Sequence, residues 1–251
     1  MVRLAKEIQH LDQGNRFNMK HPFTCLVSGP TGSGKTSLVK NIINEKTISP
    51  TPKNVLWLYA ADQPLYKGMK SVHFHQGIPD DIEHRFNSKT NNLLIIDDLM
   101  TQCHSDERMT RLFSVGSSHN NLSIIFIVHN LFHHGKEMRN ISLNTHYIIL
   151  FKNPRDSLQI STLARQMYPG KSQFLIEAYQ DATKNPHGYL FIDLKPNTNE
   201  LLRIRTGILP QDTHYVYLSK LQHEEIQSSE NNQDVQTTSN TSTISPIVIT
   251  K

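Results

Sequence analysis

The chain has 251 residues, of which 37% are hydrophobic and 19% charged, so it can bury one sizeable core but hardly two complete domains. The formal net charge of +4 agrees with an anionic partner such as nucleic acid without requiring one. The composition excludes a disulfide scaffold, because only Cys25 and Cys103 are present, and no apolar run is long enough to cross a bilayer. We therefore expect a soluble, intracellular protein with no membrane partner.

The predicted elements alternate between strands and helices along the chain. Continuous apolar runs predict strands at residues 23–27, 54–60, 72–75, 92–98, 122–130 and 145–151. Helical spacing of apolar residues predicts helices at residues 36–44, 106–119, 158–167 and 172–182. Residues 188–194 and 201–207 are predicted to close the fold as an antiparallel strand pair. This order is typical of an α/β fold with a mostly parallel central sheet and helices on both faces.

The domain organisation is predicted from changes in composition. Residues 1–20 are expected to be an N-terminal extension, and residues 21–220 to form one folded domain. From residue 221 onward, Ser, Thr, Asn and Gln replace large apolar residues. This composition predicts a disordered polar tail over residues 221–251.

A glycine-rich turn separates the first predicted strand from the first helix. Gly29, Gly34, Lys35 and Thr36 satisfy the pattern G-x-x-x-x-G-K-[ST] of the phosphate-binding loop. Glycines let the backbone turn its N–H groups inward, the lysine reaches the β and γ phosphates, and the threonine hydroxyl binds Mg²⁺. The motif predicts a P-loop NTPase that binds ATP and Mg²⁺ through Gly29, Pro30, Thr31, Gly32, Ser33, Gly34, Lys35, Thr36 and Ser37.

Two carboxylates end the strand predicted at residues 92–98. Asp97 is predicted to hold Mg²⁺ together with Thr36, and Asp98 to act as the general base that polarises the attacking water. An Asp-Asp pair after a strand is also an ordinary turn or helix cap, but its place behind a phosphate loop favours the catalytic interpretation. The second acidic residue favours ATP hydrolysis over a nucleotide switch, which often leaves water activation to Gln.

The strand predicted at residues 122–130 ends in two polar residues. Hydrolysing ATPases of the additional-strand type place such a strand between the phosphate-loop strand and the acidic strand, where its tip touches the γ-phosphate or the water. His129 and Asn130 fall at this tip, and we favour Asn130 because its amide both donates to phosphate and accepts from water. A plain surface turn is the alternative for each residue.

The stretches "GPTGSGKT", "LLIIDD", "IIFIVHN" and "RNISLNTHYIILFKNPRDSLQISTLARQMYP" together resemble the FtsK/HerA-type viral genome-packaging ATPases, and most of all those of Polinton/Maverick elements and adintoviruses. The resemblance covers residues 23–210. It implies a homo-oligomeric ring that takes ATP between subunits and drives double-stranded DNA into a preformed viral capsid, with a capsid or portal-like protein as partner. The implied location is the host nucleus or cytoplasm, or the virion. This chain departs from the family at Asn130, where Gln is usual, and at Asp98, where Glu is common.

A ring ATPase usually completes its site with an arginine from the next subunit, because the delocalised guanidinium stabilises the charge of the transferring phosphoryl group. We favour Arg139 and then Arg155, since both lie in turns beside the strand predicted at residues 145–151. Each of them, like Arg108, Arg111 and Arg165, is also explained by a surface charge or an ion pair. The loop at residues 131–139 combines aromatic and basic residues, and it is predicted either to contact DNA or to be a plain surface loop.

Three alternative functions are compatible with the sequence. A P-loop helicase or another DNA-dependent ATPase is the nearest, because it shares the motor chemistry. A small-molecule kinase would carry a lid with clustered arginines over a second substrate, and the sequence has no such cluster. A non-hydrolysing nucleotide-binding interaction module would need neither Asp98 nor an arginine in trans. The sequence favours an ATP-hydrolysing motor for DNA packaging.

Overall fold

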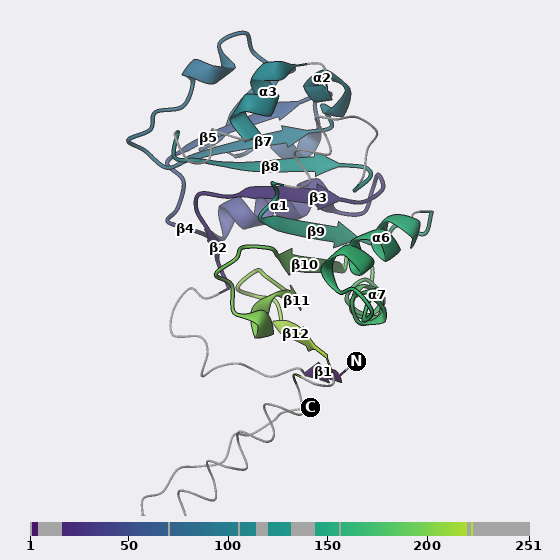
Figure 1. Ribbon diagram of the computed structural model, residues 1–251. Helices are drawn as coiled ribbons and strands as arrows, with labels where there is room; N and C mark the ends of the chain where they lie inside the picture. The colour runs from purple at the N-terminus through teal and green to yellow at the C-terminus, as the bar shows by residue number, and fades with distance from the viewer. Residues whose placement is uncertain are drawn as a thin grey trace, which may run out of the picture.

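The computed structural model describes residues 2–4, 17–69, 71–104, 106–113, 120–131, 144–155, 157–219 and 222. The strands of the central sheet are β1 (Val2–Leu4), β3 (Thr24–Ser28), β5 (Asn54–Tyr59), β6 (His73–Gln76), β7 (Asn92–Asp97), β8 (Leu122–Val128), β9 (Tyr147–Phe151), β10 (Tyr189–Asp193), β11 (Ile204–Thr206) and β12 (Tyr215–Leu218). They form one ten-stranded sheet in the order β1-β12-β11-β10-β9-β3-β8-β7-β5-β6 (Figure 1). Two short strands, β2 (Met19–Lys20) and β4 (Ile48–Ser49), pair in parallel beside it.

The larger part of the sheet is parallel. Strands β9, β3, β8, β7, β5 and β6 run in one direction. The carboxyl ends of β9, β3, β8 and β7 point to the right in Figure 1. Strand β8 pairs with both β3 and β7, which confirms the additional strand expected between the phosphate-loop strand and the acidic strand. Since the carboxyl ends of parallel strands meet at one edge, the segments that follow β3, β7, β8 and β9 converge there.

The remaining strands extend the sheet in antiparallel fashion. Strand β10 pairs antiparallel with both β9 and β11, which confirms the predicted C-terminal pair. Strands β12 and β1 were not predicted, and they continue the sheet by pairing β12 with β11 and β1 with β12. The first part of the predicted strand at residues 201–207 instead forms a 3₁₀ turn, η4 (Glu200–Leu202), whose N-cap Asn199 accepts a hydrogen bond from the Leu201 amide.

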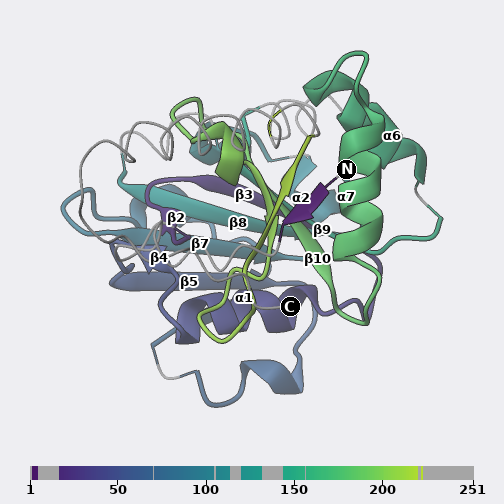
Figure 2. The same cartoon turned by 90° about the horizontal axis from the view of Figure 1, so that it is seen from below.

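Helices cover both faces of the sheet. They are α1 (Lys35–Asn44), α2 (Met100–His104), α3 (Glu107–Arg111), α6 (Ser157–Met167) and α7 (Gln173–Ala182), with further 3₁₀ turns η1 (Pro64–Tyr66) and η2 (Ile82–His84). Figure 2 shows α1 on one face of the sheet and α7 on the other. None of the described helices is long and apolar enough to cross a membrane.

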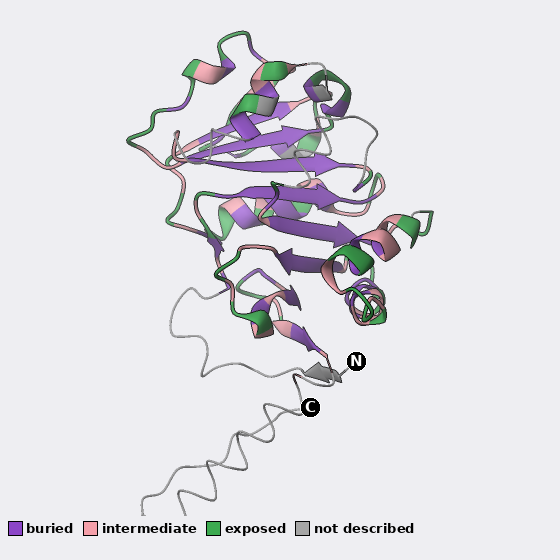
Figure 3. Cartoon of the chain, viewed as in Figure 1, coloured by how far each residue is buried: buried purple, intermediate pink, exposed green. Residues whose placement is uncertain are grey.

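The alternation of side chains along the strands divides the core into two layers. On β7, Leu93 and Ile95 belong to the cluster that contains the buried face of α1, whereas Leu94 and Ile96 belong to the cluster formed with α2, α3, α6 and α7. The central strands are buried along their whole length, as expected for parallel strands covered on both faces (Figure 3). The same alternation directs Asp97, the last residue of β7, to the face of α1.

The helix predicted at residues 106–119 is only partly described. Asp106 is its N-cap and accepts a hydrogen bond from the Arg108 amide, so α3 begins where the sequence predicted a helix start. The chain stays helical through Leu112 and Phe113, and residues 114–119 lie outside the described residues. Helix α2 was not predicted, because it spans little more than one turn and carries no periodic pattern of its own.

Candidate functional site

The predicted phosphate loop, residues 29–37, connects β3 to α1 at the carboxyl edge of the sheet. Gly32 and Gly34 have φ angles of 77° and 102°, a region that other residues rarely adopt. At Gly29 the constraint is space, because an added Cβ would lie 2.7 Å from Cβ of Phe151 on β9. These backbone angles and this close approach explain why the turn requires glycine at all three positions.

Lys35 is the first residue of α1, and its side chain turns back under the loop. The side chain is largely buried, and Nζ donates hydrogen bonds to the carbonyl oxygens of Gly29 at 2.7 Å and Pro30 at 2.9 Å. Burial lowers the pKa of the Lys35 ammonium, while the nearby carboxylates of Asp97 and Asp98 raise it. The site therefore places one cation between the backbone of the loop and two acidic residues.

Asp97 is the hydrogen-bond acceptor of a three-residue cluster. Its side chain is 3% exposed, and Oδ2 accepts hydrogen bonds from Thr36 Oγ1 at 3.2 Å and from Tyr66 OH at 3.1 Å. Burial raises the pKa of the Asp97 carboxyl, and the hydrogen bonds from Tyr66 and Thr36 lower it. The predicted Mg²⁺ ligands, Thr36 and Asp97, are thus in direct contact, and Tyr66 holds the carboxylate from the side of β5 and β6.

Tyr66 had no signal in the sequence. It lies in η1, between β5 and β6, and reaches Asp97 only because β5 and β7 are neighbours in the sheet. The ring is buried among aromatic residues, with ring centroids 5.4 Å from Trp57, 5.1 Å from Tyr59 and 4.9 Å from Phe74. This packing fixes the position of the hydroxyl that points to Asp97.

Asp98 and His129 meet at the tips of two adjacent strands. Asp98 follows β7 with a φ of 59°, and its Oδ1 lies 2.9 Å from His129 Nε2. Both side chains are partly exposed, 56% for Asp98 and 42% for His129. Asn130 is exposed and is the next residue along the same tip, so both polar residues of the predicted tip lie at the edge that carries the phosphate loop.

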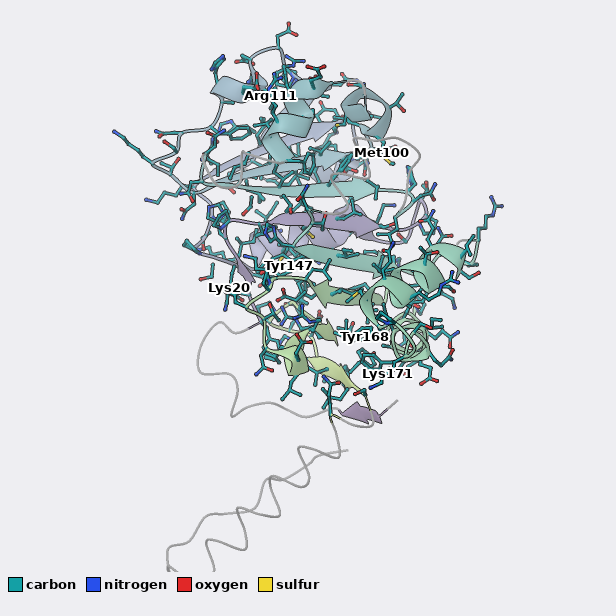
Figure 4. The ribbon with its side chains drawn as sticks, in the orientation of Figure 1. Lys20, Met100, Arg111, Tyr147, Tyr168 and Lys171 are labelled. Carbon is teal, nitrogen blue, oxygen red and sulfur yellow. The ribbon has the colours of Figure 1, made fainter. Side chains whose placement is uncertain are left out.

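The candidate arginines fall in different environments. Arg155 is exposed in the turn after β9, whereas Arg139 and the loop from residue 132 to residue 139 lie outside the described residues. Arg108 pairs with Asp106 at 2.7 Å, and Arg111 pairs with Glu83 at 3.0 Å. Figure 4 shows Arg111 on α3, away from β9 and the turn that follows it. Arg165 donates to the carbonyl of Ser161 within α6.

A cavity of about 400 Å³ adjoins the phosphate loop on the side of β9. Its walls are residues 30–33 of the loop, Phe151 and Lys152 at the end of β9, and the turn at residues 184–188 that follows α7. His187 in this turn has a φ of 60°, and its Nδ1 contacts the carbonyl oxygen of Ser33 at 3.1 Å. Nothing in the sequence indicated that this turn lies at the phosphate loop. The turn directly precedes β10, and it reaches the loop because β10 pairs antiparallel with β9.

Comparisons with known proteins agree with this geometry at the level of the fold. No protein-family model matches the chain, and no curated protein matches it in sequence. The solved structure of the genome packaging NTPase B204 from Sulfolobus turreted icosahedral virus 2 with sulfate aligns with a TM-score of 0.51 and 12% identity, over 75% of this chain and 96% of that chain. The AMP complex of the same NTPase gives a TM-score of 0.45 and 15% identity, over 70% and 94% of the two chains.

A more distant match is the ATPase DotB of Legionella pneumophila, with a TM-score of 0.36 and 13% identity over 68% of this chain and 54% of that chain. At such low identity, a likeness shows the fold alone. The chain has the α/β fold of the P-loop NTPases, with a mostly parallel sheet and C-terminal antiparallel strands. The arrangement of its strands and helices is similar to that of the viral genome packaging NTPase B204.

Proposed function

We propose that this protein hydrolyses ATP and uses the energy to move double-stranded DNA into a viral capsid. The observation that carries the proposal is the contact between Thr36 at the start of α1 and Asp97 at the end of β7, beside a glycine-rich loop closed by Lys35. A hydroxyl and a carboxylate oxygen are the donors that Mg²⁺ prefers. The residues present therefore fit the ion, which would supply charge neutralisation for the phosphates when bound.

In the proposed complex, the phosphate loop binds the phosphates of ATP and the cavity binds its nucleoside. Backbone N–H groups of the loop and of the start of α1 bind the phosphates. Lys35 Nζ then donates its hydrogen bonds to phosphate oxygens instead of the carbonyl oxygens of Gly29 and Pro30. The nucleoside enters the cavity between Phe151 and the turn at residues 184–188, which has room for a base and a ribose. Asp98 then accepts a proton from the attacking water at the carboxyl edge.

The DNA-moving part of the proposal rests on the sequence motifs together with the fold. Structural likeness to the genome packaging NTPase B204 supports a packaging role over the kinase and binding-module alternatives. A homo-oligomeric ring would bring Arg155, or Arg139, of one subunit to the phosphates of its neighbour. The loop at residues 131–139 would face the DNA. The relation to Polinton/Maverick elements and adintoviruses is proposed from the quoted motifs alone.

Triplex displacement tests this function directly. A third-strand oligonucleotide is annealed to linear duplex DNA, and its release is followed after addition of protein, ATP and Mg²⁺. We expect release that requires ATP and is lost in Lys35→Ala, which removes the cation of the loop, and in Asp98→Asn. Release of single strands from the duplex itself would instead identify a helicase. ATP hydrolysis without any displacement would contradict the motor.

A further inference from the structure

The two acidic residues at the end of β7 have different surroundings. Asp97 is buried and faces α1, as the alternation along β7 dictates. An extended residue at position 98 would point to the opposite face of the sheet. Asp98 instead has a φ of 59°, which ends the strand, and its amide contacts the carbonyl oxygen of Ile127 on β8 at 3.4 Å. The backbone therefore turns Asp98 toward β8 at the carboxyl edge.

The register between β7 and β8 places His129 beside Asp98. Asp97 pairs with Ile127, so the residues that follow the two strands are neighbours in space. His129 lies one residue past the end of β8, and its Nε2 reaches Asp98 Oδ1 at 2.9 Å. The imidazole and the carboxylate are thus in close polar contact, and the charge of Asp98 raises the pKa of the nearby Lys35 ammonium. Asp98 is thus oriented by β8 while it remains beside the phosphate loop.

We propose that His129 is a positioning residue that holds the carboxylate of Asp98 in the orientation needed to take a proton from water. This inference rests on the proposed function and deepens it. A carboxylate that is more than half exposed samples several rotamers, and a close polar contact with an imidazole restricts them. Partners that orient metal ligands typically change activity by about 10–100-fold when they are removed, and we expect a loss of this order for the partner of a base. His129 thus orients the base, whereas Asn130 is predicted to contact the γ-phosphate or the attacking water directly.

The experiment compares kcat, KM and ATP affinity of the full chain with those of five variants. His129→Ala removes the imidazole that contacts Asp98, and His129→Gln places an amide N–H group at similar reach. Asp98→Asn and the double variant His129→Ala/Asp98→Asn test whether His129 acts through Asp98. His73→Ala, an exposed histidine at the amino end of β6, is the matched control.

We expect His129→Ala to lower kcat about 10-fold with KM and ATP affinity unchanged, and His129→Gln to regain most of that loss. In the Asp98→Asn background, His129→Ala should cause no further loss. Wild-type kcat in His129→Ala, no rescue by Gln, or a full additional loss in the double variant would each overturn the inference. Absence of ATP hydrolysis in the wild-type chain would refute the proposed function itself, and the inference with it.

Discussion

Tyr66→Phe removes a single oxygen atom from the candidate site and leaves the ring in place. The ring stays packed against Trp57 and Phe74, so the variant should keep the fold. What is lost is the hydrogen bond to Oδ2 of buried Asp97, at 3.1 Å. A hydrogen bond to a charged group contributes about 1.5–3 kcal/mol, and second partners of metal ligands typically change metal affinity by about 10–100-fold. We therefore expect Mg²⁺ to bind at least about 10-fold more weakly to the protein–ATP complex.

The assay is a Mg²⁺ titration of ATP hydrolysis at saturating ATP, repeated across pH. The hydrogen bond from Tyr66 lowers the pKa of Asp97, so its removal should raise that pKa and move the acidic limb of the pH profile to higher pH. Tyr59→Phe, in the same aromatic cluster, is the matched control and should behave like wild type. An unchanged Mg²⁺ midpoint in Tyr66→Phe, or an equal shift in Tyr59→Phe, would refute the assignment of Tyr66 to Asp97.

Further predictions concern the packing around the site. Gly188→Ala should destabilise the protein by about 1–3 kcal/mol in urea unfolding, because an added Cβ would lie 2.4 Å from a backbone oxygen at the end of α7; an unchanged midpoint would contradict this contact. Burial raises the pKa of the Cys25 thiol, and that of Cys103 to about 12, so neither should react with a thiol reagent at pH 8 until denaturant is added. Burial lowers the pKa of His21 below 6.5, so the unfolded chain binds more protons than the folded one at acidic pH. The free energy of unfolding should therefore fall on acidification below pH 6.5, and it should fall less steeply in His21→Gln. Equal pH slopes in the two proteins would rule out His21 as the cause.

The sequence predicted the parts of the site that lie next to one another in the chain. The phosphate loop could be predicted from a short run of residues, because the positive φ angles that it needs before α1 are supplied by glycines within that run. Asp97 was predictable because "LLIIDD" is a continuous apolar run that ends in carboxylates, and the alternation along β7 then directs it to α1. The additional strand β8 was predictable from its apolar length and polar tip.

Other parts depend on contacts between distant segments, and the sequence carried no signal for them. Tyr66 reaches Asp97 across the sheet, and His187 returns to the carbonyl of Ser33 from 154 residues away. Strand β12 is short and follows a turn, and only its pairing with β11 and β1 makes it a strand. The contact of His129 with Asp98 depends on the φ of Asp98, which no propensity specifies. Arg139 and the loop around it stay predictions.

The most direct test of the central claim is ATP turnover by the purified protein with and without linear double-stranded DNA, in the presence of Mg²⁺. The account predicts hydrolysis that DNA stimulates and that Lys35→Ala abolishes, because the loop then lacks the cation that neutralises the phosphates. Nucleotide binding without hydrolysis, or hydrolysis that DNA leaves unchanged, would contradict a DNA motor.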